Sequence, residues 1–163
     1  MTLKDKEVTS LLPQFNHSVH TSDQYTATAV ASGPDGWNGT VSSEGMDFQF
    51  ALPSHMGGTG VGVNPEQMFA VGYSACLLGS IQHIAKKQGK YELTKDAKVV
   101  AKVSIGKAEG MSGWGIGVEV EVEGLKGKGM EDSEAEALLK AGSEFCPYSR
   151  LLKHGAVVTS KCI

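Results

Sequence analysis

The order of apolar and polar residues predicts a strand-rich first part of the chain. Apolar and polar positions alternate between Tyr25 and Leu52, as in strands with one covered face. The pattern predicts strands over 25–31, 37–43 and 46–52, with turns at 33–36 and 44–45. Residues 1–23 show no sustained periodicity, so we expect a polar N-terminal extension followed by a single domain over 24–163.

A long apolar segment after the strands predicts a core helix. Asn64 and Gln67 have the spacing of a capping box, and a proline stands at the first helical position. The helix is expected to end at Lys87, with Gly89 just beyond it. Residues 68–81 carry no charge, which predicts burial on nearly every side.

The second half of the chain alternates between strand and helix patterns. Two strands are predicted over 95–107 and 114–123, joined as a hairpin with one wet face. Ser133 and Glu136 predict a capping box that opens a helix through Phe145, and a short turn then leads to a last strand over 156–162. The order βββ-α-ββ-α-β indicates an α+β domain with helices against antiparallel sheet.

Composition narrows the function classes. The formal net charge is -3, which gives no reason to expect nucleic acid or an anionic membrane as a partner. The first residues contain no apolar signal region, so a cytoplasmic location is expected. The three cysteines favour free thiols over a disulfide framework. Cys146, His154 and Cys162 do not have the spacing of a metal site, and none is expected.

Two cysteines lie where a reactive site could form. Cys76 stands in the middle of the predicted core helix, and Cys146 stands at the end of the second one. Peroxide chemistry needs such a pair, because a sulfenic acid must be trapped as a disulfide before it oxidises further. Taken alone, each is more often an inert core thiol, and Cys162 is expected to have no role. His83 is about 10.5 Å from Cys76 along the helix, too far for a direct pair.

The glycine-rich segment 57–62 precedes the core helix. It matches neither dinucleotide-binding nor phosphate-binding spacing. A mobile flap over a site and a plain connector are both open interpretations.

Two motifs together resemble one known family. Asn64-Pro65-Glu66-Gln67 running to Cys76, followed later by Cys146-Pro147-Tyr148-Ser149, resembles the Ohr/OsmC family of organic hydroperoxide resistance proteins, closer to its Ohr branch. The likeness extends from about Tyr25 to the C-terminus. It implies antiparallel sheets packed around two central helices in an intertwined homodimer. It further implies reduction of organic hydroperoxides by dithiols such as lipoyl groups, with no metal or bound cofactor.

The motif match also implies residue roles. Cys76 falls at the peroxidatic position, Cys146 at the resolving position and Glu66 at the site glutamate. The candidates for lining a substrate pocket, each of which could equally be plain core, are Met68, Phe69 and Tyr73.

One position departs from the family pattern. An arginine of the first turn activates the thiol in the family, and Pro34 stands at that place here. The chain has a single arginine, Arg150, which is the first candidate for an activating cation, and His55 is the second. Without a cation, Cys76 should be mostly protonated at neutral pH. Two alternatives therefore stay open: a member with weakened peroxidase chemistry that binds ligands or senses thiols, and a generic thiol oxidoreductase, which the absence of Cys-x-x-Cys disfavours.

Overall fold

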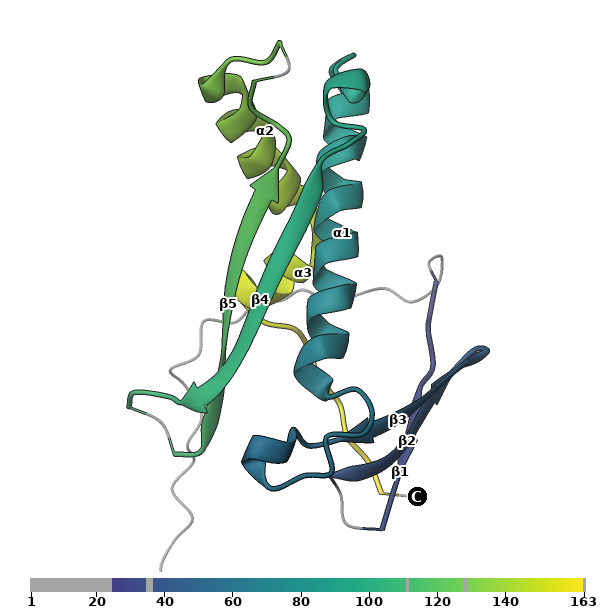
Figure 1. The fold of residues 1–163 in the computed structure, drawn as a ribbon. Helices are drawn as coiled ribbons and strands as arrows, with labels where there is room; N and C mark the ends of the chain where they lie inside the picture. Colours follow the sequence, from purple (N-terminus) through teal and green to yellow (C-terminus); the bar gives the residue numbers. More distant parts are fainter. Residues whose placement is uncertain (1–24, 35–36, 111, 128, 163) are drawn as a thin grey trace, which may run out of the picture.

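The structure, a computed structural model, describes residues 25–34, 37–110, 112–127 and 129–162. The predicted extension over 1–23 lies outside these residues. Figure 1 shows a long helix, α1, flanked by a β-hairpin and two further helices, with a small sheet near its first turn. The elements in chain order are β1 (Val30–Ser32), β2 (Asn38–Ser43), β3 (Met46–Ala51), η1 (Ser54–Met56), α1 (Pro65–Lys87), η2 (Tyr91–Leu93), β4 (Lys98–Lys107), β5 (Trp114–Glu123), α2 (Asp132–Phe145) and α3 (Pro147–His154).

The first sheet is the predicted antiparallel meander, with strand order β1-β2-β3. β2 and β3 agree with the predicted strands within one residue, but β1 is much shorter than predicted. Val30 pairs with Ser42 of β2, and the partner strand ends at Ser43. The chain turns immediately afterwards, at Glu44 and Gly45, so the residues before Val30 have no backbone beside them to pair with.

The bounds and caps of α1 confirm the prediction for the core helix. The side chain of Asn64 accepts a hydrogen bond from the Gln67 backbone, and the Gln67 side chain accepts one from Asn64. Gly89, just past the C-cap, has a φ of 70°, a conformation that glycine adopts without strain.

Burial of α1 on nearly every side was a wrong expectation for the single chain. Its buried face carries Tyr73, Leu77 and Ile81, at helical spacing. The opposite face is open, and Val71 is 70% exposed. By length and composition alone α1 could cross a membrane. Its packing against α2 and β4 is instead that of a core helix.

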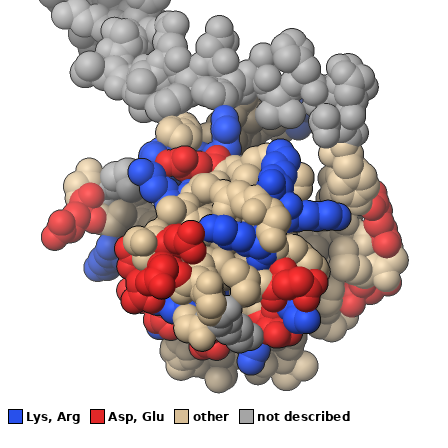
Figure 2. All heavy atoms as spheres, turned by 90° about the horizontal axis from the view of Figure 1, so that it is seen from above, with Lys and Arg blue, Asp and Glu red and all other residues tan. Residues whose placement is uncertain are grey.

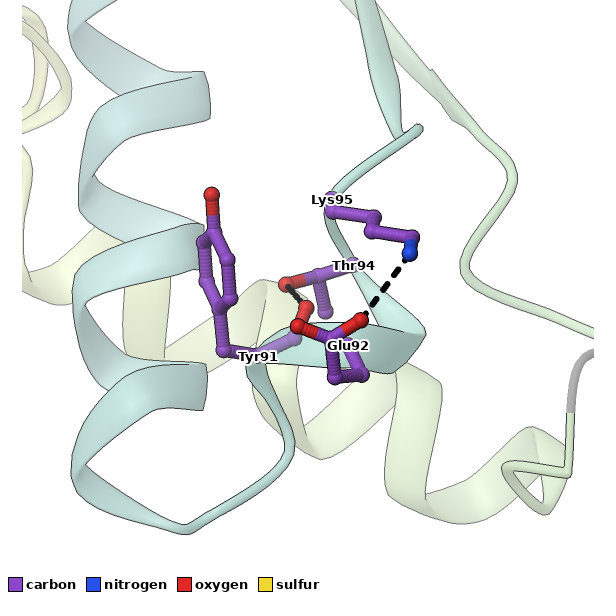
Figure 3. A network of polar contacts seen from close by, with 4 residues as sticks. All are labelled: Tyr91, Glu92, Thr94 and Lys95. Carbon is purple, nitrogen blue, oxygen red and sulfur yellow. Dashed lines mark hydrogen bonds and ion pairs between the residues drawn. The ribbon is translucent and has the colours of Figure 1, made fainter.

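The β4–β5 hairpin lies along α1 and forms the second sheet (Figure 1). β4 begins at Lys98, three residues later than predicted, because the preceding residues form η2 and a tight turn. The Thr94 hydroxyl donates to the Tyr91 carbonyl, and Lys95 pairs with Glu92 at 2.9 Å (Figure 3). Thr94 is fully buried, so this turn is fixed against the core.

Three predictions for the end of the chain were wrong. α2 begins at Asp132 with no side-chain cap, so Ser133 opens no capping box; acidic residues in the first turn favour the helix N-terminus instead. The expected turn after Cys146 is the helix α3, because a proline that stops one helix is also well placed at the first position of the next. Residues 156–162 pair with no strand of the described chain and are exposed, so they form no strand here.

The core lies between α1, α2 and the hairpin. Its fully buried side chains include Leu77, Ile81 and Cys146. Gly142 allows α2 to pack closely on α1, because an added Cβ at this position would lie 2.6 Å from the Ile81 side chain. On the face seen from above, acidic and basic side chains are interspersed (Figure 2), which gives that face no extended charge of one sign.

Candidate thiol site

The two candidate cysteines lie side by side. Cys76 is on the middle turns of α1, and Cys146 stands at the junction between α2 and α3. Their Sγ atoms are 3.5 Å apart. Cys146 is fully buried, whereas Cys76 is half-buried. Folding therefore brings together two thiols that are 70 residues apart in the chain.

Aromatic rings of α1 and α3 pack in the same core cluster as the two thiols. The Tyr148 ring stacks on Tyr73 with an interplanar angle of 10°, and Phe69 contacts both rings at centroid distances of 5.8 and 6.2 Å. A Cβ at Gly72 would lie 3.0 Å from the Tyr148 hydroxyl, so the glycine allows α3 to approach α1. The rings and the thiols thus belong to one interface between the two helices.

A hydrogen bond beside the thiols was not anticipated from the sequence. The hydroxyls of Tyr73 and Ser149 are 3.0 Å apart, and either can donate. Both residues were visible in the quoted motifs, since Tyr73 precedes Cys76 by three residues and Ser149 follows Cys146 by three. That spacing places the Tyr73 side chain on the same face of α1 as Cys76, but no sequence signal pairs Tyr73 with Ser149.

The surroundings shift the pKa values of the two thiols in opposite directions. Burial raises the pKa of Cys76, and the neighbouring Cys146 thiol raises it further, while the Tyr148 backbone lowers it in part. Burial also acts to raise the pKa of Cys146. The pKa of Cys146 is nevertheless lowered, because hydrogen bonds to its sulfur outweigh the effect of burial. These bonds come from the Ser149 backbone and hydroxyl, from Cys76 and from the Tyr148 backbone. A pair that interacts this closely shares its titration, so the two protons leave in steps that belong to the pair as a whole.

Comparison with known proteins shows the family to which the chain belongs. The family described as OsmC-like protein matches residues 57–161. The chain belongs to the OsmC/Ohr family. An uncharacterised protein of Acinetobacter baylyi is 41% identical over 130 residues, covering 80% of this chain and 87% of that protein. The organic hydroperoxide resistance protein OhrB of Bacillus subtilis is 35% identical over 126 residues, covering 77% and 88%.

A solved structure supports the same OsmC/Ohr assignment. The organic hydroperoxide resistance protein OsmC of Legionella pneumophila superimposes with a TM-score of 0.69 at 34% identity. The match covers 82% of this chain and 93% of that one. The predicted OsmC-like fold, with antiparallel sheets around central helices, is therefore confirmed.

Three further residues predicted for the OsmC/Ohr site are not part of the thiol pair, although the Arg150 backbone N–H donates to the Cys146 carbonyl at 3.0 Å. Glu66 is half-buried in the first turn of α1, about 15 Å from Cys76 along the helix axis. His55 is exposed on η1. Arg150 is exposed on α3 and lines a cavity of about 590 Å³ with Lys140, Lys153 and His154. The activating role of each stays a prediction.

The candidate pocket residues divide in the same way. Phe69 and Tyr73 lie in the ring cluster beside the thiols, whereas Met68 is half-buried elsewhere on α1.

The glycine segment 57–62 is tied to β3 by backbone hydrogen bonds. The Gly60 backbone donates to the Leu52 carbonyl, and Val63 forms a β-bridge to β3. These bonds favour the connector over the mobile flap. Within the described residues no group of His, Cys, Asp and Glu is arranged to hold a metal.

Proposed function

We propose that this chain is a thiol-dependent peroxidase that reduces organic hydroperoxides to alcohols. The observation that carries the proposal is the 3.5 Å distance between the Cys76 and Cys146 sulfur atoms. A disulfide needs about 2.05 Å, so closure requires only a small movement of the two side chains. Family relatives named as organic hydroperoxide resistance proteins support this role.

The proposed chemistry divides the two thiols into attacking and resolving partners. The Cys76 thiolate attacks the distal peroxide oxygen, the O–O bond breaks, and the alkoxide leaves and takes up a proton. The Cys146 thiolate then attacks the Cys76 sulfenic acid, and the expelled hydroxide leaves as water. One hydroperoxide and two thiols give one alcohol, one water and one disulfide. An external dithiol, for which lipoyl groups are candidates, reduces the disulfide, and no bound cofactor or metal is needed.

The half-exposed side of the thiol pair suits an apolar hydroperoxide. Cys76 retains some exposure while Cys146 has none, which suits the first to meet a substrate and the second to act afterwards. Phe69 and Tyr73 supply apolar surface beside it. A cytoplasmic location agrees with free thiols as reactants.

A homodimer is part of the proposal. The exposed face of α1 carries Val71, and the β1–β3 sheet exposes Val30, Met46 and Phe48 at 63%, 54% and 41%. Apolar side chains in such number on one chain are typical of a surface that a partner covers. A second copy of the chain is the partner that the family resemblance implies.

Variants of the three cysteines test the proposal. Cys76→Ser should abolish turnover, because no sulfenic acid can form at the attacking position. Cys146→Ser should allow one oxidation and then let Cys76 proceed to sulfinic acid. Cys162→Ser should change little, because Cys162 is exposed and is not part of the thiol pair. Mass spectrometry after hydroperoxide treatment measures these products, and a dominant disulfide that involves Cys162 would refute the assigned roles.

A second candidate function is a binding or thiol-sensing protein with weakened peroxidase chemistry. The raised pKa of Cys76 and the presence of Pro34 in place of the family arginine favour it. Sustained turnover of cumene hydroperoxide with a dithiol supports the peroxidase, and its absence supports the sensor. Reduction of protein disulfides instead would favour a generic thiol oxidoreductase.

A further inference from the structure

A chain of hydrogen-bonding groups leads from α1 through α3 back to the attacking thiol. The Tyr73 and Ser149 hydroxyls are 3.0 Å apart, and Ser149 interacts with Cys146 through its backbone and its hydroxyl. The Cys146 sulfur lies 3.5 Å from that of Cys76, whichever of the two carries the proton. Tyr73 is 7% exposed and Cys146 is fully buried, so water competes little for these positions.

The direction of the donors follows from the chemistry of the groups. A thiolate at Cys146 accepts hydrogen bonds only, so the Ser149 hydroxyl donates to it. The Tyr73 hydroxyl must then donate to Ser149, because the serine proton is already in use. When Cys146 is protonated, its thiol donates to the Cys76 sulfur. When Cys146 is ionised, the Cys76 S–H is the remaining donor across the same 3.5 Å contact. The lowered pKa of Cys146 and the raised pKa of Cys76 agree with a resting pair that carries its negative charge on Cys146.

We propose that Cys146 acts twice: first as the base that removes the proton of Cys76, and afterwards as the resolving thiol. Tyr73 and Ser149 are positioning residues that hold the Cys146 thiolate ready for the first of these steps. The proposal rests on the proposed peroxidase function and supplies an activator from within the chain, where the family's arginine is replaced by Pro34.

The proton balance closes over the cycle. The Cys76 proton moves across the 3.5 Å gap to Cys146, and the Cys76 thiolate attacks the distal oxygen of the hydroperoxide. The departing alkoxide takes the proton from Cys146 and leaves as the alcohol, which regenerates the Cys146 thiolate. That thiolate attacks the sulfenic acid, the S–O bond breaks, and a disulfide and hydroxide are formed. Each group is therefore in the required protonation state when its step begins.

The titratable groups facing the pair are few among the described residues. They are the two thiols themselves, Tyr73 of α1 and Tyr148 of α3. The faces of α2 and the hairpin that pack against this cluster contribute apolar side chains, among them Leu138, Leu139, Val99, Ala101, Val118 and Val120. Among the described residues, no carboxylate is one of the groups that shift the pKa of either thiol.

The first experiment measures the oxidation step alone. Reduced protein is mixed with a stoichiometric amount of cumene hydroperoxide without reductant, and hydroperoxide loss is followed against pH. A Cys162→Ser background removes the exposed third thiol. Adding Cys146→Ser should slow this step at neutral pH by at least about ten-fold. It should also shift to higher pH the range in which the oxidation rate increases. A purely resolving Cys146 leaves rate and profile unchanged, and that result would overturn the proposal.

A second set of variants keeps both thiols. Tyr73→Phe retains the stacked ring and removes only the hydroxyl, and Ser149→Ala removes the next group of the chain. Each should slow oxidation at neutral pH about ten-fold and shift its pH profile upward, because each weakens a hydrogen bond that supports a charged group. Tyr91→Phe is the matched control: its hydroxyl points away from the turn network in Figure 3, and it should leave the profile unchanged.

Ultraviolet titration of the thiolates gives a readout that needs no substrate. With Cys162 replaced, the Cys76→Ser variant reports Cys146, and the Cys146→Ser variant reports Cys76. The Cys146 thiolate should form at the lower pH, and Ser149→Ala should raise that pH. If the Cys76 thiolate forms at the lower pH instead, the proposed base role of Cys146 is overturned, even in a protein with normal turnover. The expected order in a protein that consumes no hydroperoxide would overturn the peroxidase function while retaining the acidic Cys146.

Discussion

The helical part of the molecule and the β1–β3 sheet differ in how completely the chain covers them. α1, α2, α3 and the hairpin bury a common core, and the two thiols lie inside it. The β1–β3 sheet buries one of its apolar residues, Ala51, while Val30 and Phe48 are exposed. The first region can hold its site by its own packing, whereas several apolar side chains of the second stay exposed in the single chain.

This difference separates two tasks in the proposed enzyme. The pairing of Cys76 with Cys146 lies within the helical part, because the elements that carry the two cysteines, α1, α2 and α3, pack on one another. The sheet and the exposed face of α1 are available for the second copy of the chain. The family's arginine belongs to the turn that here holds Pro34, in the sheet region. Pro34 is uncharged, so it supplies no cation to the thiol pair from this turn.

The largest expected effect comes from the core of the helical part. Leu77 is 1% exposed on α1, so Leu77→Ala should lower the free energy of unfolding by about 2–5 kcal/mol. Phe48→Ala removes a larger side chain from the sheet, but that side chain is 41% exposed and should contribute much less. Urea unfolding at one protein concentration compares the two. Equal losses would show that the sheet is as well covered as the core.

A second comparison uses two glycines in helices. Gly142→Ala places a Cβ 2.6 Å from the Ile81 side chain and 3.0 Å from its Cα, and should cost about 1–3 kcal/mol by pushing α2 from α1. Cys146 is on the same segment, so disulfide formation should slow as well. Gly79 has open space around it in the single chain, and Gly79→Ala should be neutral or slightly stabilising. A large loss at Gly79 would indicate that a partner helix packs there.

The sequence was sufficient for most of the helical part. The capping box of Asn64 and Gln67 fixed the start of α1, and the alternation in β5 gave its bounds, because both signals are local. The missing last strand was predicted over 156–162, where Val157, Val158 and Thr159 favour a strand, but a strand also needs a partner edge, which no local pattern specifies. Its assignment from the sequence failed for that reason.

The site was predictable only in part. The cysteines were found through their motifs, but their 3.5 Å separation depends on how α3 packs across α1, which the sequence does not state. α3 itself was missed because Pro147 was interpreted as a stop. The hydrogen bond between Tyr73 and Ser149 joins residues 76 positions apart and has no local signature. Contacts of this kind require the tertiary structure.

A moderate effect is expected on assembly. Val71→Lys adds a charge to the open face of α1 and should weaken the proposed homodimer at least about ten-fold, equivalent to about 1.4 kcal/mol. Val100→Lys is the control, because Val100 is exposed on the face of the hairpin that also carries Lys102 and Glu121. Sedimentation at micromolar concentration measures both. A wild-type chain that sediments as a stable monomer would contradict the dimer.

The smallest expected effect is that of Arg150. A cation near Cys76 would lower its pKa, so its loss should shift the pH profile of oxidation to higher pH. Arg150 is exposed, and interactions of exposed charges contribute only about 0–1 kcal/mol. Arg150→Met should therefore slow oxidation at neutral pH less than Ser149→Ala does, with Lys153→Met as a control from the same cavity. A larger shift in Arg150→Met than in Ser149→Ala would make the arginine, and not the Cys146 thiolate, the main activator of Cys76.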